Sequence, residues 1–476
     1  MFNMYYMFSF IQDSSIVYLK RIAINALMKK IVVAISFFFI CETVKAQVIL
    51  DQYIHEAYSN NLVLRGKKLA LDKSLLAIKE ARNLFLPTIW LETQYTLAKG
   101  GRTIDIPIGD LLNPVYTTLN QLTSSNSFPQ VQNVKEQFLP NNFYDVRIKT
   151  TVPILNPDIS INHNIKQQEV ELKENEILIY KRELAKEIKM AYYNYMMSGH
   201  AILILEGALS IVKQNLKLNE SLLRNGKGLP AYVTRAESEV MDVENQLLNA
   251  RNSEINAIAY FNFLLNKPLT TNIVQEETDL KPSQMQQLLA KENNVLLREE
   301  IKSFNTASKI SENILKMNRS FSKPRLNAFV DMAAQGFDFR VNRNSLFYLG
   351  GVQLQIPIYS GKRNLMKIEQ TQYDLQSLKL STEQLQEQLQ LAALQSLNNA
   401  QNAYNAYLTN LKKQESAAQY FKLLERGYTE GVNSFIEFLD ARNQLTSAQL
   451  QLNISKYRFL AGLAEFERQT AGYQLQ

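Results

Sequence analysis

Cysteine is almost absent from the 476-residue sequence, in which Cys41 is the single example. Cys41 falls in an apolar N-terminal stretch, so the sequence that follows excludes disulfide bonds, thiolate metal sites and cysteine nucleophiles together. Glycine and proline are also sparse, with 16 and 12 residues, and charged residues make up 20% of the chain. This differs from the composition of disordered chains and indicates a folded protein.

Long hydrophobic runs are missing as well. Beyond the N-terminal stretch the sequence has no uninterrupted apolar run of about 18 residues, so it predicts no transmembrane helix. A chain of this kind that crosses a membrane must do so with strands, because only helices and closed barrels satisfy the backbone in lipid.

The N-terminus itself has the pattern of a secretory signal peptide. A pair of lysines precedes the apolar run 31–40, and Ala46 provides a small residue at the expected cleavage point. We therefore assign residues 1–46 to an N-terminal extension and signal peptide, and expect the mature chain to begin at Gln47. The alternative is a cytosolic protein with an apolar N-terminal helix.

The rest of the chain contains an internal repeat. A Val-Pro-Ile sequence around Pro153 returns as Ile-Pro-Ile around Pro357, 204 residues later. A glycine turn at Gly228 returns at Gly431, 203 residues later. The segments between these landmarks are therefore nearly equal in length in the two halves.

The repeat predicts the domain organisation. Residues 47–268 form the first repeat and residues 291–468 the second. Residues 269–290, which follow Lys267-Pro268 and contain Lys281-Pro282, are expected to be an equatorial linker, and residues 469–476 a C-terminal tail.

Each repeat is expected to contain two strands and a very long helix. The segment 362–426 has neither Gly nor Pro, which makes about 97 Å of helix at roughly 1.5 Å per residue. Its apolar residues recur at the coiled-coil period, and a compact domain cannot bury a helix of that length. The predicted elements are strands 88–98 and 142–153 around a loop over 99–141, helices 158–224 and 230–266, strands 326–335 and 347–358, and helices 362–426 and 433–468.

The strand segments alternate in character. Over 142–153, Val146 and Ile148 face one way while Arg147 and Lys149 face the other. Strands of about ten residues with one apolar and one charged face match an outer-membrane barrel. The alternative is four half-buried strands of a soluble sandwich. Four strands cannot close a barrel in lipid, so a membrane location requires several chains to contribute strands.

The arrangement resembles the TolC family of outer-membrane efflux channels over nearly all of the mature chain. The most specific matches are the Pro153 and Pro357 strand-to-helix junctions and the segment from Gly427 to Ala441. The resemblance implies an α+β, mostly α fold: a two-repeat protomer with long coiled-coil helices in a periplasmic α-barrel. Its four strands would join a trimeric 12-stranded outer-membrane β-barrel. It also implies a homotrimer that contacts outer-membrane lipid, a periplasmic adaptor (membrane fusion) protein and an inner-membrane pump.

The resemblance assigns roles to particular residues. Glu437 and Asp440 fall on a family motif of two acids that ring the pore constriction and favour cations. Tyr428 matches a tyrosine that helps to close the tip, and Gly228 and Gly431 match the glycines of the periplasmic turns. An exposed helix face without a pore function is the alternative for the acid pair, because such a pair costs only about 0.2–0.5 kcal/mol.

The sequence departs from the family pattern at two positions. Asn433 stands where the family has an arginine of the closing network, and Thr234 stands where the first repeat has an acid. We therefore expect closure to use other contacts, for which Arg235, Glu237 and Arg426 are candidates.

Other functional classes find no support in the sequence. No Ser/His/Asp arrangement, no histidines at metal-ligand spacing and no nucleotide-binding loop are present, so we expect no enzyme activity, no cofactor and no metal site. Lys and Arg lie beside acids along the helices, which argues against nucleic acid as a partner. The sequence predicts the passive export duct of a tripartite efflux or type I secretion system. A secreted or periplasmic coiled-coil scaffold or adaptor without a pore is the alternative.

Overall fold

The computed structural model describes residues 48–276, 285 and 295–475. The signal peptide expected over 1–46, and most of the linker expected over 269–290, lie outside the described residues. The elements in chain order are α2 (Val48–Asn60), α3 (Leu62–Asn83), β1 (Thr88–Thr96), β2 (Thr103–Ile106), α4 (Ile108–Thr123), β3 (Val134–Gln137), β4 (Phe143–Leu155), α5 (Pro157–Arg224), α6 (Pro230–Leu264), η2 (Val295–Leu297), α8 (Glu299–Arg319), η3 (Ser320–Ser322), β5 (Arg325–Phe337), β6 (Leu346–Gln355), α9 (Arg363–Thr429) and α10 (Phe435–Gln469).

The chain divides into two compact units. Unit 1 comprises the described residues of Met1–Leu71, Leu172–Asn305 and Leu380–Gln476, and unit 2 comprises Asp72–Glu171 and Thr306–Lys379. Unit 1 is helical, whereas unit 2 holds the strands together with α4 and parts of the long helices.

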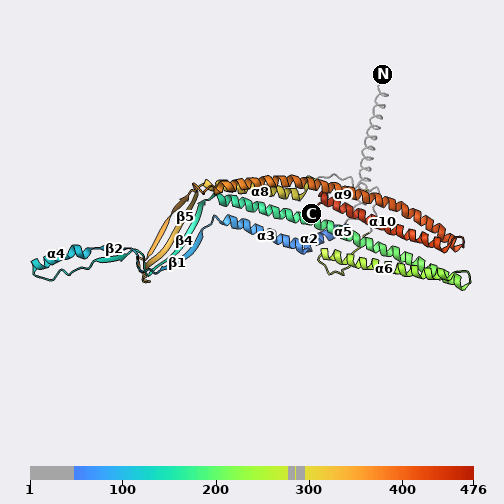
Figure 1. The fold of residues 1–476 in the computed structure, drawn as a ribbon, viewed down its shortest axis with the longest axis horizontal. Helices are drawn as coiled ribbons and strands as arrows, with labels where there is room; N and C mark the ends of the chain where they lie inside the picture. Colours follow the sequence, from blue (N-terminus) through green and yellow to red (C-terminus); the bar gives the residue numbers. More distant parts are fainter. Residues whose placement is uncertain (1–47, 277–284, 286–294, 476) are drawn as a thin grey trace, which may run out of the picture. The chain divides into compact units, whose positions relative to one another are not determined.

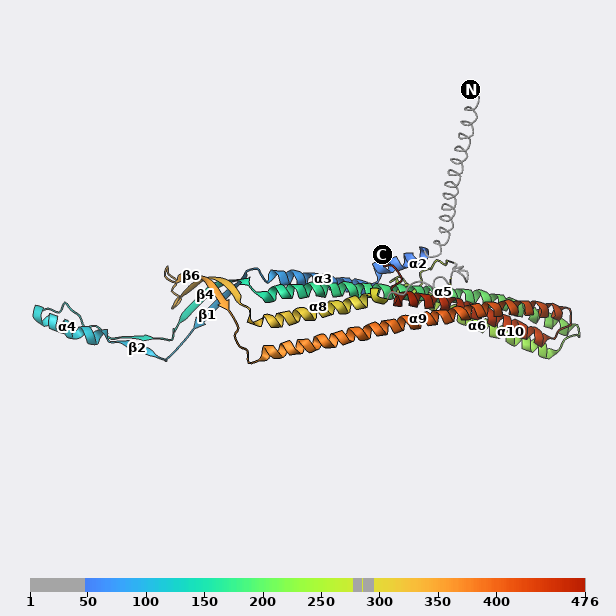
Figure 2. The same cartoon turned by 90° about the horizontal axis from the view of Figure 1, so that it is seen from above.

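Two helices of unusual length follow the strand segments, as expected from the scarcity of glycine and proline. α5 has 68 residues and α9 has 67. Within unit 1, α5 forms an antiparallel hairpin with α6, and α9 forms one with α10 (Figures 1 and 2). The repeat seen in the sequence therefore appears as two equivalent helical hairpins.

The unit 1 core gathers residues from several helices. The largest fully buried side chains include Phe261 of α6, together with Tyr457 and Phe459 of α10. They belong to one cluster with Ile54 of α2 and Ile188 of α5. Burial of a large apolar side chain is worth about 1.5–3 kcal/mol, so this cluster anchors both hairpins to the N-terminal helices.

Among the described helices, α5 alone is long and apolar enough to cross a membrane by length and composition. About a third of its most apolar window is buried inside the protein. α5 supplies Leu184, Ile188 and Met196 to the unit 1 core, so its apolar residues serve helix packing.

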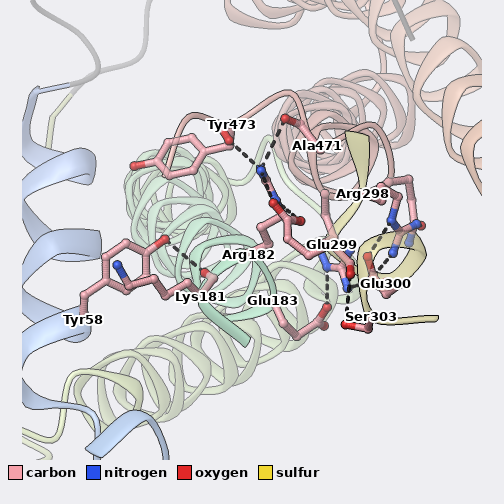
Figure 3. Close-up of polar contacts among 12 residues, drawn as sticks. Tyr58, Lys181, Arg182, Glu183, Arg298, Glu299, Glu300, Ser303, Ala471 and Tyr473 are labelled. Carbon is pink, nitrogen blue, oxygen red and sulfur yellow. Dashed lines mark hydrogen bonds and ion pairs between the residues drawn. The ribbon is translucent and has the colours of Figure 1, made fainter. Parts of the chain in front are cut away.

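Arg182 of α5 holds α8 through a bidentate ion pair and the C-terminal segment through backbone hydrogen bonds. Arg182 Nε and Nη2 donate to the two carboxylate oxygens of Glu299 over 2.7 and 2.8 Å (Figure 3). Its Nη1 donates to the backbone carbonyls of Tyr473 and Ala471. Both charged side chains are nearly buried, and the paired geometry gives directional as well as electrostatic stabilisation.

A second cluster joins α8 to α10. The Glu300 carboxylate accepts hydrogen bonds from Arg298 and from Arg468, at 2.7 and 2.8 Å. Arg468 also donates from Nε to Glu183 of α5 over 3.0 Å. Buried arginines are thus paired with carboxylates, as buried charges must be.

Unit 2 contains a four-stranded antiparallel sheet in the order β1-β4-β5-β6. Residues directly opposite one another on neighbouring strands point their side chains to the same face. One row across the sheet is Leu91, Ile148, Met332 and Tyr348. These four side chains are 73%, 47%, 64% and 86% exposed.

The opposite face of the sheet is polar. Its rows include Glu92 opposite Arg147, and Lys149 opposite Asp331. Asp145 lies on the same face and forms an ion pair with Arg147. The pairing register therefore places the charged residues of β1, β4 and β5 on one face, as the alternation in the sequence predicts, whereas β6 adds Phe347 and Leu349 to that face.

The sequence predicts a loop over 99–141, and this prediction is wrong for the interior of the segment. This segment contains the short antiparallel strands β2 and β3, which form a separate two-stranded sheet, and the 16-residue helix α4 between them. We call residues 103–137 the arm. Its Gly, Pro, Ser and Asn residues resemble a loop in composition, but asparagine side chains there bind backbone groups and hold the helix in place.

Candidate functional site

Each hairpin has one turn between its two helices, and both turns use the same backbone motif. After α9, the Gly431 N–H donates to the carbonyl of Tyr428, and the Val432 N–H to that of Gly427. After α5, the Gly226 and Lys227 N–H groups make the corresponding bonds. Gly226 and Gly431 have φ of +71° and +77°, the left-handed conformation that this helix end requires.

The structural counterpart of Gly431 is therefore Gly226, not Gly228. Gly226 stands at the same distance before Pro230, the first residue of α6, as Gly431 does before Phe435, the first residue of α10. Gly228 lies in the same turn but serves a different purpose, because a Cβ there would lie 2.7 Å from the backbone nitrogen of Leu223. Matching by letters alone misplaced the register by two positions.

Glu437 takes part in the start of α10. Ser434 is the N-cap, and its backbone N–H and hydroxyl donate to the Glu437 carboxylate over 2.7 and 2.9 Å. In return the Glu437 N–H donates to the Ser434 hydroxyl oxygen. These bonds from Ser434 lower the pKa of the exposed Glu437 carboxyl, so it stays ionised. The capping pair is a structural role that the sequence interpretation missed.

Asp440 lies one turn further along the same exposed face. Its carboxylate accepts a hydrogen bond from the Gln444 side chain over 2.7 Å. Glu437, Asp440 and Gln444 are all exposed, whereas Phe438 and Leu439 are buried. The structure thus places both acids together on the side of α10 that faces away from its hairpin partners.

Tyr428 connects the two hairpins within one chain. Its hydroxyl donates to Asn219 Oδ1 of α5 over 3.1 Å, and its ring stacks on Phe438 of α10 at 5.0 Å. The Asn219 amide in turn donates to Asn215, which fixes its oxygen toward the tyrosine. Burial raises the pKa of the Tyr428 phenol, so the hydroxyl remains a donor.

Aromatic packing completes this contact. The buried cluster at the tip includes Phe421 of α9 and Phe435 and Phe438 of α10. Tyr232 of α6 packs against Phe435 with ring centres 5.2 Å apart. We use the word tip for the two turns and this cluster.

A buried ion pair lies beside the cluster. Arg442 Nη2 of α10 donates to Glu239 Oε2 of α6 over 2.7 Å, with side chains 2% and 8% exposed. Arg235 reaches the other oxygen of Glu239 from an exposed position. Desolvation lowers the pKa of Arg442, although its attraction to Glu239 opposes that effect. Glu239 lies in the first repeat and Arg442 in the second, and their spacing in the sequence does not predict this contact.

Of the other candidates for tip contacts, Arg426, Asn433 and Thr234 have local partners. Arg426 pairs with Glu430 on the exposed surface, and Glu237 is exposed. The Asn433 N–H donates to the Gly427 carbonyl, and its side chain occupies the space that a Cβ of residue 427 would need. The Thr234 hydroxyl donates to the carbonyl of Pro230.

The two junction prolines differ in position. Pro153 lies within β4 next to a shift of register, and α5 begins shortly afterwards at Pro157. Pro357 lies just beyond the last residue of β6 and precedes α9. Proline at such an irregular strand end removes no ladder hydrogen bond that the sheet needs.

The comparisons with known proteins agree with this geometry. Residues 311–466 match the family model described as outer membrane efflux protein. Outer membrane protein TolC of Salmonella enteritidis is 22% identical over 419 residues, which cover 86% of this chain and 79% of TolC.

Solved structures share the fold over most of the chain. The CmeC outer membrane channel of Campylobacter jejuni has a TM-score of 0.68 at 13% identity, covering 89% of this chain and 86% of CmeC. The outer membrane protein VceC of Vibrio cholerae also scores 0.68 at 13% identity, covering 89% of this chain and 97% of VceC. Together these comparisons show that the chain is similar to outer membrane efflux proteins in sequence, and that it shares the fold of solved outer-membrane channels over most of its length.

Proposed function

We propose that the chain is the outer-membrane channel component of a tripartite efflux or type I secretion system, a passive duct for small molecules across the periplasm and outer membrane. The observation that carries the proposal is the sheet of unit 2. Its apolar row of Leu91, Ile148, Met332 and Tyr348 is exposed, and its opposite face carries the charged residues of β1, β4 and β5. A barrel with lipid outside and water inside needs such a sheet.

The sheet also supports a homotrimer. β1 and β6 are its two edges, and each has one partner strand within the described chain. Unpaired edges are not tolerated in lipid, so β1 of one copy pairs with β6 of the next. Three copies of four strands close a 12-stranded barrel, a size within the range of outer-membrane barrels.

The acid pair forms the constriction in this proposal. Three copies of Glu437 and Asp440 converge on the axis and attract cations, because rings of carboxylates select for positive ions. Counting from the helix starts, α6 has Tyr232 and Arg235 at the corresponding positions. The acids therefore come from one hairpin of each chain, and α6 contributes an exposed arginine between them.

Tyr428 keeps the tip closed by joining the hairpins of one chain. The bond to Asn219 must be lost if α9 and α10 move away from α5, whereas the stacking on Phe438 lies within the α9–α10 hairpin and holds the tyrosine ring in place. Opening therefore requires work, and a periplasmic adaptor and an inner-membrane pump supply it.

A conductance experiment tests the proposal. The protein is solubilised from outer membranes with detergent, its mass is measured, and it is inserted into planar bilayers. We expect a trimer with cation-selective conductance. Glu437→Gln with Asp440→Asn should weaken selectivity, and glutamine retains the hydrogen bond from Ser434 that alanine would lose. A monomer that stays out of the membrane fraction would favour the coiled-coil scaffold instead, and unchanged selectivity would leave the acids as an ordinary exposed face.

A further inference from the structure

The arm presents an apolar helix face that nothing in the described part of the chain covers. On α4, Leu111, Val115 and Leu122 are 69%, 52% and 77% exposed. Gly109 is the single buried residue of the helix. A two-stranded hairpin with one uncovered amphipathic helix is marginal in water, so this face calls for a partner.

The polar face of α4 is already covered by residues 128–131, which run back along the helix toward β3. The Asn113 amide donates to the Val131 carbonyl and accepts from the Val131 N–H, at 2.9 and 2.8 Å. Asn120 does the same with Phe128, at 2.7 and 3.0 Å. These two bidentate pairs lie one heptad apart and fix the rotation of the helix, so its apolar side must face outward.

The spacing of that side suggests which partner it fits. Leu111, Val115, Thr118 and Leu122 follow one another at alternating intervals of four and three positions. This is the coiled-coil seam, in which the apolar stripe of one helix packs into that of an equivalent helix. Leu112 and Leu119 widen the stripe on one side.

Charge argues for a protein partner over a lipid surface. Asp110 is the one charged residue within α4, which has no Lys or Arg. Helices that lie on membranes are typically rich in basic residues on their polar face. The position of the arm points to a further copy of the same chain, because it leaves the sheet between β1 and β4 and β1 is the strand that meets the next copy.

We propose that the α4 helices of the three copies pack against one another through Leu111, Val115 and Leu122, and form a helical bundle beyond the strand ends of the barrel. This inference rests on the proposed trimer. It gives the arm the role of an additional assembly contact at the mouth of the duct.

Disulfide trapping in the full-length protein tests the proposal. A Cys41→Ser background removes the native thiol, and Leu122→Cys places a new one on the seam. Gln121→Cys is the matched control, because it is exposed, adjacent in sequence and turned about 100° around the helix. Outer membranes are oxidised and the chains are separated without reductant. We expect a covalent dimer for Leu122→Cys that exceeds the control by about fivefold or more, since disulfides need Cα atoms within roughly 7 Å.

Two results would overturn the inference in different ways. Equal or absent trapping at both positions, in a protein whose solubilised and reduced mass is that of a trimer, would refute the arm contact and leave the channel intact. Equal or absent trapping with a monomeric mass would refute the trimer on which the inference rests. A bimane label on Leu122→Cys that reports a lipid environment would assign the face to the membrane, against the proposal.

Discussion

The buried pair of Glu239 and Arg442 tests how the two hairpins are held together. Arg442 is 2% exposed and bonds to Glu239 over 2.7 Å, whereas Arg235 bonds to the same carboxylate from a position that is 62% exposed. Loss of Arg442 leaves Glu239 with one solvated partner. Breaking a buried pair costs about 3–5 kcal/mol, and an exposed pair contributes about 0.2–1 kcal/mol.

The lower end of that range applies here. Arg442 Nε is buried without a hydrogen-bond partner, so removal of the guanidinium also removes an unsatisfied donor. We expect Arg442→Met to destabilise the tip by about 3 kcal/mol, and Arg235→Met by less than about 1 kcal/mol. A double variant with Glu239→Met should recover part of the loss, because no unpaired buried charge remains.

Hydrogen exchange is the appropriate measurement, because the effect is confined to the tip. Peptides covering residues 230–245 and 435–450 report the free energy of local opening in the detergent-solubilised protein. Peptides from the unit 1 core serve as the internal reference. Equal changes for Arg442→Met and Arg235→Met would refute the reasoning, since the two arginines share one carboxylate and differ in burial.

Two further variants probe the tip and the polar cluster. Tyr428→Phe keeps the ring on Phe438 but leaves the buried Asn219 oxygen without its donor, which destabilises the contact by about 1–3 kcal/mol. The channel should therefore open more often in planar bilayers. Unchanged gating would exclude this bond from closure. Burial raises the pKa of Glu300, but the hydrogen bonds and charges of Arg298 and Arg468 outweigh it and lower the pKa from 4.5 to about 2. Its stabilisation is therefore complete above pH 4.5, is worth about 3 kcal/mol, and is lost as the pH falls toward 2. Thermal unfolding across that interval should be less pH-dependent in Glu300→Gln, and parallel curves for the two proteins would contradict the assignment.

The long helices and the strands could be predicted because their signals are local and repeated. The whole segment 362–426 lacks Gly and Pro, and this alone predicts a helix too long for a compact domain. Val146 and Arg147 alternate along β4, and the period of two places them on opposite faces of the sheet.

Contacts between distant segments could not be read in this way. Glu239 meets Arg442 because α6 and α10 pack side by side, and no spacing within either helix encodes that partner. The arm was missed for another reason. Asn113 and Asn120 resemble loop residues in composition, and their helical role appears only when the returning chain supplies backbone groups to bind.

The two edge strands of the sheet, β1 and β6, have a consequence for cells that make both normal and variant chains. In the proposed ring of three chains, each chain completes the strand ladder of both neighbours, so a chain with a defective edge spoils every ring that it enters. If normal and defective chains are made equally and mix at random, about one ring in eight is free of defects. Edge variants of this protein are therefore expected to be dominant, although variants of the helical core that fail to fold are not.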